Sequence, residues 1–194
     1  MEFPLYDFTS NGNCGFLGFR MCQNRIAVAV FSHLLETEGF GQVIELGTQL
    51  GGFSALLGLQ CQMIGARFDT FDIQRETLYP EWFIRFGIHY HIVDILSDTG
   101  TTLIRELIQT EKRVLLLCDN GQKVEEFRRF APFLKTGDVI GAHDYHPDGV
   151  DNSRNWAWNE IGDKAVEFIC QRLGLAPFHQ ADFTEAAWLM RVKT

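Results

Sequence analysis

The apolar run VIEL is followed by the glycine-rich segment GTQLGG, a composition that lets a ligand approach the backbone closely. Gly47, Gly51 and Gly52 carry no side chains, so they leave space for a nucleoside lying across the ends of sheet strands. The amides that begin the next helix would face this ligand, with Ser54 near the first turn. Glu45 can balance positive charge on it. These residues predict a site for a nucleoside-bearing cofactor.

A carboxylate one strand further along the chain can bind the ribose of such a cofactor. Asp72 lies 21 positions after Gly51, near the offset of about 20 residues at which an acidic residue accepts the ribose hydroxyls. Asp69 is the competing carboxylate, but the pattern places it in the middle of a strand, where it would face solvent or form a pair. We therefore predict that Asp72 binds the ribose.

Two further apolar runs end in side chains that can move a proton. Asp119 ends RVLLLCD, and His143 and Asp144 end DVIGAHD. A histidine has a pKa near neutrality and can act as a general base, with Asp144 or Asp119 orienting its ring. The polar residues that follow in HDYHPDGVD stand beside a proline and a glycine, which predicts a solvated loop.

Strands and helices that alternate along the chain must position these residues. The expected strands are VIEL, RFDTFD, HYHIVD, RVLLLCD and DVIGAHD, and helical patterns such as Thr101–Gln109 and VEEFRRFAPFL separate them. Strands that are apolar on both faces form a mostly parallel sheet covered by helices on both sides. A helix over Asn24–Glu36 precedes them, after an irregular start, and another helix covers Asp163–Leu173.

The pattern changes near the C-terminus. PFHQADF and AAWLMRV are both strand-like, and only three residues separate them. So short a connection requires an antiparallel hairpin, because a parallel return needs about a dozen residues. We therefore expect an α/β fold: a Rossmann-like, doubly wound, mostly parallel seven-stranded sheet with an antiparallel C-terminal hairpin.

Composition limits the classes of partner. The 194 residues suffice for one α/β domain, and the formal charge of −8, with scattered basic residues, argues against nucleic acid as a partner. No apolar run is long enough to span a membrane, and the first residues do not form a signal peptide. Five cysteines without a CxxC pair indicate thiols in a reducing compartment. We expect a cytoplasmic, soluble protein.

Two segments resemble a known family. VIELGTQLGGFSALL is similar to the first motif, E-x-G-x-x-x-G, of class I S-adenosylmethionine-dependent methyltransferases, in the form of the cephalosporin-hydroxylase-like and macrocin-O-methyltransferase-like groups. LLLCDNGQKVEEFRRFAPFLKTGDVIGAHDY resembles the later part of the same families, so the likeness covers roughly residues 40–145 and the hairpin. It implies a single methyltransferase domain over residues 1–194, with an N-terminal lid and helix (1–38) and an acceptor-side insertion (146–162).

The resemblance implies S-adenosylmethionine as the cofactor. In these families a carboxylate after the third strand accepts from the adenine amino group, and an apolar neighbour packs on the ring; Asp94 and Ile95 occupy these positions. An aspartate after a strand is also a good helix cap, so both roles for Asp94 stay open. The cofactor-binding residues implied are Glu45, Gly47, Thr48, Gly51, Ser54, Asp72, Asp94 and Ile95.

The resemblance also implies a metal at the acceptor side. Asp119, His143 and Asp144 stand where metal-dependent relatives hold Mg²⁺ or another divalent cation that lowers the pKa of a hydroxyl. Two departures count against it: Gln122 replaces a family histidine, and His143 stands where a second carboxylate is common. Metal-dependent catalysis and direct catalysis by His143 with Asp119 and Asp144 are therefore both open.

The expected function is O-methylation of a hydroxylated small molecule, with N-methylation open. One alternative is a non-catalytic S-adenosylmethionine-binding module, which the imperfect metal set favours. An NAD-dependent oxidoreductase is disfavoured, because the loop lacks the G-x-G-x-x-G pattern. The expected partner is a small-molecule acceptor, with no nucleic acid and no membrane, and a homo-oligomer is compatible with the sequence. In the insertion, DNSRNWAWNEIGD is aromatic enough to close over an acceptor or to pack on the domain.

Overall fold

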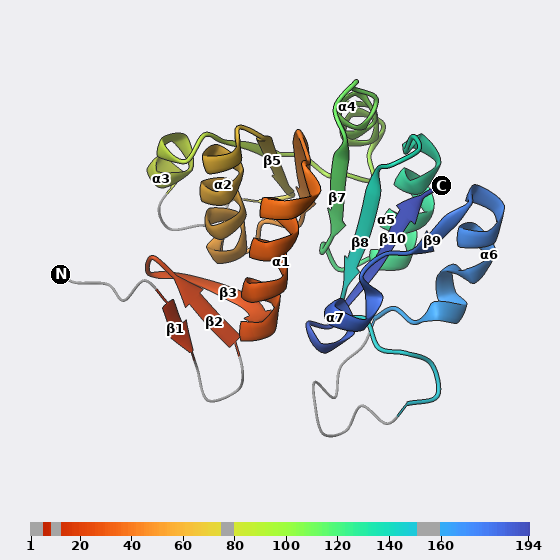
Figure 1. Cartoon of the computed structure of the whole chain (residues 1–194). Helices are drawn as coiled ribbons and strands as arrows, with labels where there is room; N and C mark the ends of the chain where they lie inside the picture. The colour runs from red at the N-terminus through yellow and green to blue at the C-terminus, as the bar shows by residue number, and fades with distance from the viewer. Residues whose placement is uncertain (1–5, 9–12, 75–79, 151–159) are drawn as a thin grey trace.

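The computed structural model describes residues 6–8, 13–74, 80–150 and 160–194 (Figure 1). Within these residues seven strands form one sheet in the order β6-β5-β4-β7-β8-β10-β9. The first five in this order are parallel, whereas β10 runs antiparallel to both β8 and β9. The strands are β4 (Gln42–Leu46), β5 (Arg67–Asp72), β6 (Ile88–Ile92), β7 (Val114–Cys118), β8 (Val139–His143), β9 (Leu175–Pro177) and β10 (Trp188–Lys193). The predicted fold class is confirmed.

Helices cover both faces of this sheet (Figure 1). One face packs against α1 (Arg25–Glu38), α2 (Gly52–Ile64), α3 (Pro80–Arg85) and α7 (Gln180–Glu185). The other packs against α4 (Asp98–Ile108), α5 (Lys123–Phe130), the short 3₁₀ turn Ala131–Phe133, and α6 (Asp163–Leu173). No helix in these described ranges is both long and apolar enough to cross a membrane.

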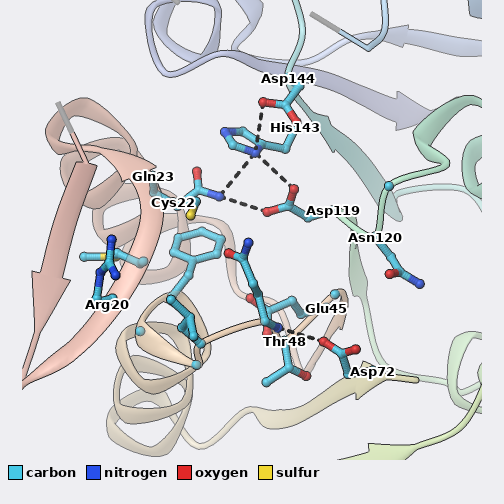
Figure 2. Close-up of a pocket in the computed structure, with 18 of the residues that line it drawn as sticks. Arg20, Cys22, Gln23, Glu45, Thr48, Asp72, Asp119, Asn120, His143 and Asp144 are labelled. Carbon is cyan, nitrogen blue, oxygen red and sulfur yellow. Dashed lines mark hydrogen bonds and ion pairs between the residues drawn. The ribbon is translucent and has the colours of Figure 1, made fainter. Parts of the chain in front are cut away.

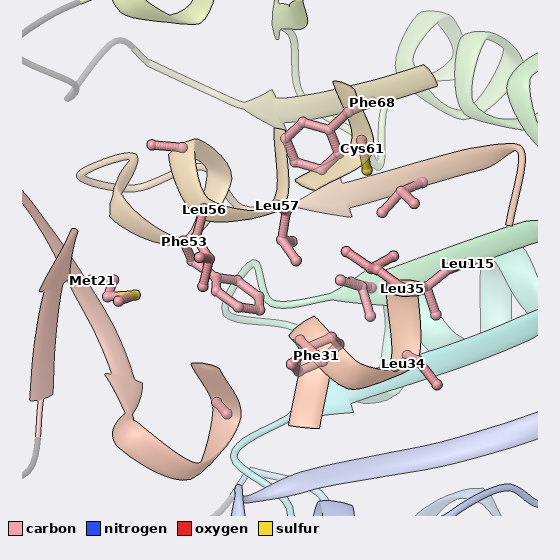
Figure 3. Close-up of a cluster of buried hydrophobic side chains, with 14 of the residues drawn as sticks. Met21, Phe31, Leu34, Leu35, Phe53, Leu56, Leu57, Cys61, Phe68 and Leu115 are labelled. Atoms are coloured by element: carbon pink, nitrogen blue, oxygen red, sulfur yellow. The ribbon is translucent and has the colours of Figure 1, made fainter. Parts of the chain in front are cut away.

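The central strand β7 shows why its sequence is almost wholly apolar. Leu115 and Leu117 point into the core under α1 and α2, which Figure 3 shows around Leu115, Phe31 and Leu57. The alternate residues, such as Leu116, point into the core under α4 and α5. A strand that is buried on both faces, such as β7, favours apolar residues along its whole length.

The C-terminal hairpin was predicted for the wrong reason. Antiparallel pairing of β9 with β10 is correct, but the second half of PFHQADF is helix α7 and not strand, so the connection is much longer than three residues. His179 turns the chain with a left-handed φ of 46°. The helical turn then buries Phe183 edge-on against Phe31, with ring centroids 5.0 Å apart. Core packing of this one phenylalanine decides against the strand.

The N-terminal segment was expected to be irregular because of its glycines, and this prediction is wrong. It forms a separate antiparallel sheet of β1 (Tyr6–Phe8), β2 (Asn13–Phe16) and β3 (Phe19–Asn24). Leu17 and Gly18 join β2 to β3 with φ values of 51° and 82°, the positive values of a tight two-residue hairpin turn. Asn24 then caps α1 by accepting a hydrogen bond from the amide of Ala27 (2.9 Å).

The small sheet lies against the start of α2 through one glycine. A Cβ on Gly52 would lie 2.4 Å from the carbonyl oxygen of Arg20 in β3, closer than two such atoms can approach. Gly52 therefore lets β3 pack directly on the first turn of α2, beside the glycine-rich loop. This contact fixes β3 at the carboxyl edge of the main sheet.

We predict that Gly52→Ala lowers the free energy of unfolding by about 1–3 kcal/mol, because backbone must shift to admit the methyl group. Urea unfolding followed by circular dichroism measures it. Gly41→Ala is the matched control: the atoms nearest its methyl group would be carbons of the exposed, flexible Lys112 side chain, and not backbone. An equal loss in both variants would show that the contact between β3 and α2 does not matter.

Candidate functional site

A cavity of about 700 Å³ opens at the carboxyl ends of β4, β5, β7 and β8 (Figure 2). From β4 the chain builds the sheet outwards through β5 and β6, and then crosses to the other side of β4 to form β7 and β8. Ligands bind at such a reversal of strand order in open α/β sheets. The wall includes Arg20–Gln23 of β3, Glu45, the loop 47–53, Asp72–Gln74, Asp119–Gly121, Lys123, His143, Asp144 and Glu160.

The glycine-rich loop is shaped by the protein's own backbone. Gly47 has a φ of 109°, and a Cβ there would lie 2.3 Å from the carbonyl oxygen of Asp119. The amides of Gly47 and Thr48 donate to the carbonyl of Phe71 (2.9 and 3.1 Å). The sequence analysis assigned the missing side chains to space for the cofactor. At Gly47 and Gly52 the structure shows that close packing of one protein segment on another already requires glycine.

Asp72 lies in the cavity wall, buried, at the end of β5. Its two carboxylate oxygens accept from the amides of Gln49 and Ile73, both at 2.8 Å. Asp69, the competing carboxylate, is completely buried elsewhere and pairs with Arg67 and His91, with a nitrogen to oxygen distance of 2.8 Å in each pair. Of the two aspartates, only Asp72 lines the cavity.

Glu45 also lines the cavity but is buried in a chain of hydroxyls. Its carboxylate accepts from Thr70 (2.5 Å) and from Ser54, and Thr70 in turn contacts Thr48 (2.7 Å between hydroxyl oxygens). Burial raises the pKa of Glu45 to about 8, although both hydroxyls oppose this. Ser54 therefore contacts Glu45 and is not part of the cavity wall.

Asp94 and Ile95, the predicted adenine contacts, do not line this cavity. Ile95 is completely buried in the core under α4 and α5. Asp94 is exposed and accepts from the amide of Leu96 (2.9 Å), forming the turn before α4. These contacts match the turn alternative, so an adenine role for either residue stays a prediction.

The predicted acceptor residues meet in one hydrogen-bonded network (Figure 2). Nδ1 of His143 lies 3.0 Å from Oδ1 of Asp119, and the other oxygen of Asp119 accepts from the side-chain amide of Gln23 (2.9 Å). The indole N–H of Trp188 donates to Oε1 of Gln23 (2.9 Å). The side-chain nitrogen of Gln23 also lies 3.5 Å from Nδ1 of His143. An ionised Asp119 can only accept, so we assign the ring hydrogen to Nδ1 and the basic lone pair to Nε2, which is buried.

Charge decides the protonation of His143. Burial by itself lowers the pKa of the imidazole, but the charge of Asp119, its hydrogen bond and the charge of Asp144 together raise it above the ordinary value. Asp144 holds a left-handed backbone, with φ 56°, at the end of β8. Such a conformation in a residue other than glycine is common at functional sites.

Lys123 is the residue that sequence reasoning missed. Its ammonium is buried and lies 2.8 Å from Asp144, 2.8 Å from Glu160 and 3.6 Å from Asp119. Burial alone lowers the pKa of Lys123, but these carboxylates raise it well above the usual lysine value, so the side chain is charged. A signal was present: Lys123, Phe127 and Phe130 share the buried stripe of α5.

The cluster of Asp119, His143 and Asp144 has ligand atoms within 4.8 Å of one another, close enough for a metal ion. The ammonium of Lys123 already lies among its carboxylates, however. A divalent ion bound to Asp119 and Asp144 would therefore stand beside a buried positive charge. The donor set as folded does not fit a metal ion, and the exposed Gln122 adds no ligand to the cavity wall.

Parts of the predicted acceptor region can be placed only partially. Asp148 accepts from the amide of Lys164 at the start of α6 (2.7 Å), and His146 contacts the carbonyl of Pro147 (3.1 Å), as expected for a loop. Arg154, Asn155, Trp156 and Trp158 lie outside the described residues. The N-terminal segment contributes a wall, since Arg20–Gln23 lie along one side of the cavity.

Solved structures share this fold, whereas no family model and no curated protein sequence matches the chain. The apo structure of CmcI-N160 matches with a TM-score of 0.64 at 17% identity, over 93% of this chain and 76% of that one. CmcI-D160 with Mg and SAM matches with a TM-score of 0.61 at 18% identity, over 92% and 76%. CmcI-N160 with SAH is covered over 66% of its length, with a TM-score of 0.53 at 18% identity and 67% of this chain aligned.

A structure from Bacillus cereus gives the same result. The O-methyltransferase from Bacillus cereus in complex with SAH matches with a TM-score of 0.56 at 10% identity, over 88% of this chain and 82% of that one. At identities this low, the structural match establishes a shared fold.

We predict that Gln23→Leu lowers the free energy of unfolding by about 1–3 kcal/mol, because Trp188 and Asp119 each lose a buried hydrogen-bond partner. Urea unfolding measures it. In the control Gln171→Leu, the residue replaced is exposed and pairs only with Glu167 on the surface of α6, so a change of about 0.5 kcal/mol or less is expected. An unchanged stability in Gln23→Leu would contradict the bridging role.

Proposed function

We propose that this protein is an S-adenosylmethionine-dependent methyltransferase that methylates a hydroxyl group of a small molecule. One observation carries the proposal: a single cavity joins a carboxylate suited to a ribose, Asp72, to a carboxylate–imidazole pair suited to remove a proton, Asp119 and His143. The structures of similar fold with SAM or SAH support it. A cavity of about 700 Å³ lies in the usual size range for small ligands.

The donor half consists of the loop after β4 and the end of β5. Asp72 has two oxygens whose remaining lone pairs can accept ribose hydroxyls while the amides of Gln49 and Ile73 hold the carboxylate in place. Glu45, beside the same loop, offers a carboxylate to a positively charged ligand. When bound, the donor supplies an electrophilic methyl group on a sulfonium.

The acceptor half consists of the ends of β7 and β8. His143 takes the proton of the acceptor hydroxyl on Nε2 while the oxygen forms its bond to the methyl carbon, and the carbon–sulfur bond breaks with its electron pair left on sulfur. Because Nε2 is buried, this step requires the wall around the ring to open to the acceptor. Asp119 stabilises the imidazolium that results, because its carboxylate accepts a hydrogen bond from the N–H group at Nδ1. Gln23 keeps Asp119 in this orientation.

The loop sequence argues against a dinucleotide oxidoreductase, since position 49 is Gln and the G-x-G-x-x-G spacing is missing. A non-catalytic donor-binding module would share the donor half and lack turnover. A single domain over residues 1–194, a lid at 1–38, an acceptor insertion at 146–162 and a cytoplasmic location stay predictions.

We predict that Asp72→Ala weakens binding of S-adenosylhomocysteine about 10- to 100-fold, because a charged hydrogen-bond acceptor for the ribose is lost. Isothermal titration calorimetry measures the affinity, and a thermal melt confirms folding. Asp98→Ala removes an equal charge from the exposed first turn of α4, outside the cavity wall, and is expected to bind as tightly as the wild type. Unchanged affinity in Asp72→Ala would rule out the ribose assignment.

A pH profile tests the acceptor half. We expect kcat/KM to rise with pH and to level off above the pKa of His143, which lies above the ordinary imidazole value, because the base acts when deprotonated. In Asp119→Asn the carboxylate that raises this pKa is gone, so the rise moves to lower pH and the plateau falls about 100-fold or more.

Asp98→Asn is the control for this profile, since it removes the same charge from the exposed first turn of α4. Its profile should match the wild type. A rise at the same pH in Asp119→Asn and in the wild type would exclude His143 as the base. Donor binding without turnover on any hydroxylated acceptor would favour the non-catalytic module.

A further inference from the structure

The ammonium of Lys123 is enclosed by acidic groups from three parts of the chain. Asp119 follows β7, Asp144 follows β8, and Glu160 precedes α6. Two of the three distances are 2.8 Å, the length of a charge-assisted hydrogen bond. The lysine side chain is only 5% exposed, so these contacts are shielded from water.

We propose that Lys123 is the resident cation of this cluster and excludes a divalent metal ion from it. A fold relative has been solved with Mg and SAM, whereas here the ammonium holds the carboxylates that a metal would need. The consequence for catalysis, a methyl transfer that needs no metal, rests on the proposed function. The exclusion itself does not.

Coordination geometry supports the exclusion. Mg²⁺ takes six ligands, mostly oxygen, at about 2.0–2.1 Å in near-ideal octahedral geometry. An ion bound between Asp119 and Asp144 would therefore lie within a few ångströms of the Lys123 nitrogen, which is 3.6 and 2.8 Å from oxygens of these residues. Like charges at this separation repel strongly in a buried site.

The lysine cannot easily withdraw. Lys123 lies on the buried stripe of α5 with Phe127 and Phe130, so its stem is directed inward by the packing of the helix. Moving the ammonium away would also leave Glu160 and Asp144 without the charge that balances them. A buried carboxylate without a partner is strongly unfavourable.

The test uses Mn²⁺ alone, as a paramagnetic substitute for Mg²⁺, titrated into the full-length protein and followed by electron paramagnetic resonance. No donor or acceptor is present, so the result does not depend on methyltransferase activity. We expect the wild type to show no site tighter than about 1 mM. Lys123→Ala should bind one Mn²⁺ at least about 100-fold more tightly, because the repelling charge is gone.

Three variants make the result specific. Lys123→Arg keeps the charge and should bind no Mn²⁺. Lys135→Ala removes an ammonium that pairs with the buried Asp138 away from the cavity (2.8 Å), and should behave as the wild type. Adding Asp144→Asn to Lys123→Ala should abolish the new site.

The proposal would be overturned if the wild type bound Mn²⁺ tightly and the single variant Asp144→Asn lost this binding. This outcome does not require Lys123→Ala to fold. A folded Lys123→Ala that binds no Mn²⁺ would overturn it too. Failure of donor binding in calorimetry would instead refute the proposed function and leave the exclusion intact.

Discussion

The carboxylate of Asp119 is the group on which the rest of the site depends. It stands at the carboxyl end of the central strand, accepts from Gln23 and His143, and lies 3.6 Å from the ammonium of Lys123. Its own backbone carbonyl is the surface against which Gly47 packs. A displaced Asp119 would disturb the base, the N-terminal sheet and the donor loop together, because partly buried charges are stable only while their partners stay in place.

The fold explains how Asp119 comes to contact so many parts of the site. The interiors of β7 and β8 are apolar, so the polar side chains of the acceptor half stand at the strand ends. The strand order brings the ends of β4, β7 and β8 side by side. Strand β3 of the small N-terminal sheet forms one wall of the cavity. From this strand Gln23 donates to Asp119, which lies 96 positions later in the chain. Packing of β3 on Gly52 holds this strand where Gln23 can reach Asp119.

Local patterns predicted most of the fold, whereas contacts between distant segments decided what they missed. Helix α6 has the predicted bounds, Asp163–Leu173, because its ends carry local signals. The run PFHQADF contains no such signal, and α7 forms because Phe183 reaches the core. The turn at Leu17 and Gly18 was missed because leucine seldom adopts a positive φ.

The site divides in the same way. Asp72, Asp119, His143 and Asp144 follow apolar strands, so their place at the cavity could be predicted from position alone. Gln23 acts through Asp119, and Lys123 acts through Asp144 and Glu160; no local pattern identifies these distant partners. Only the contact of Lys123 with Asp119, four positions earlier, is local. Ser54 was assigned to the ligand, but it faces inward to Glu45, since the first turn of a buried helix presents one side to the core.

Charge balance links the two halves of the cavity. On the acceptor side the ammonium of Lys123 offsets the charge of carboxylates that burial would otherwise penalise. On the donor side no ion pair forms with Glu45 among the described residues, and burial raises the pKa of Glu45 to about 8. A positively charged donor placed beside Glu45 would lower that pKa and ionise the acid, whereas a neutral ligand would gain nothing from it.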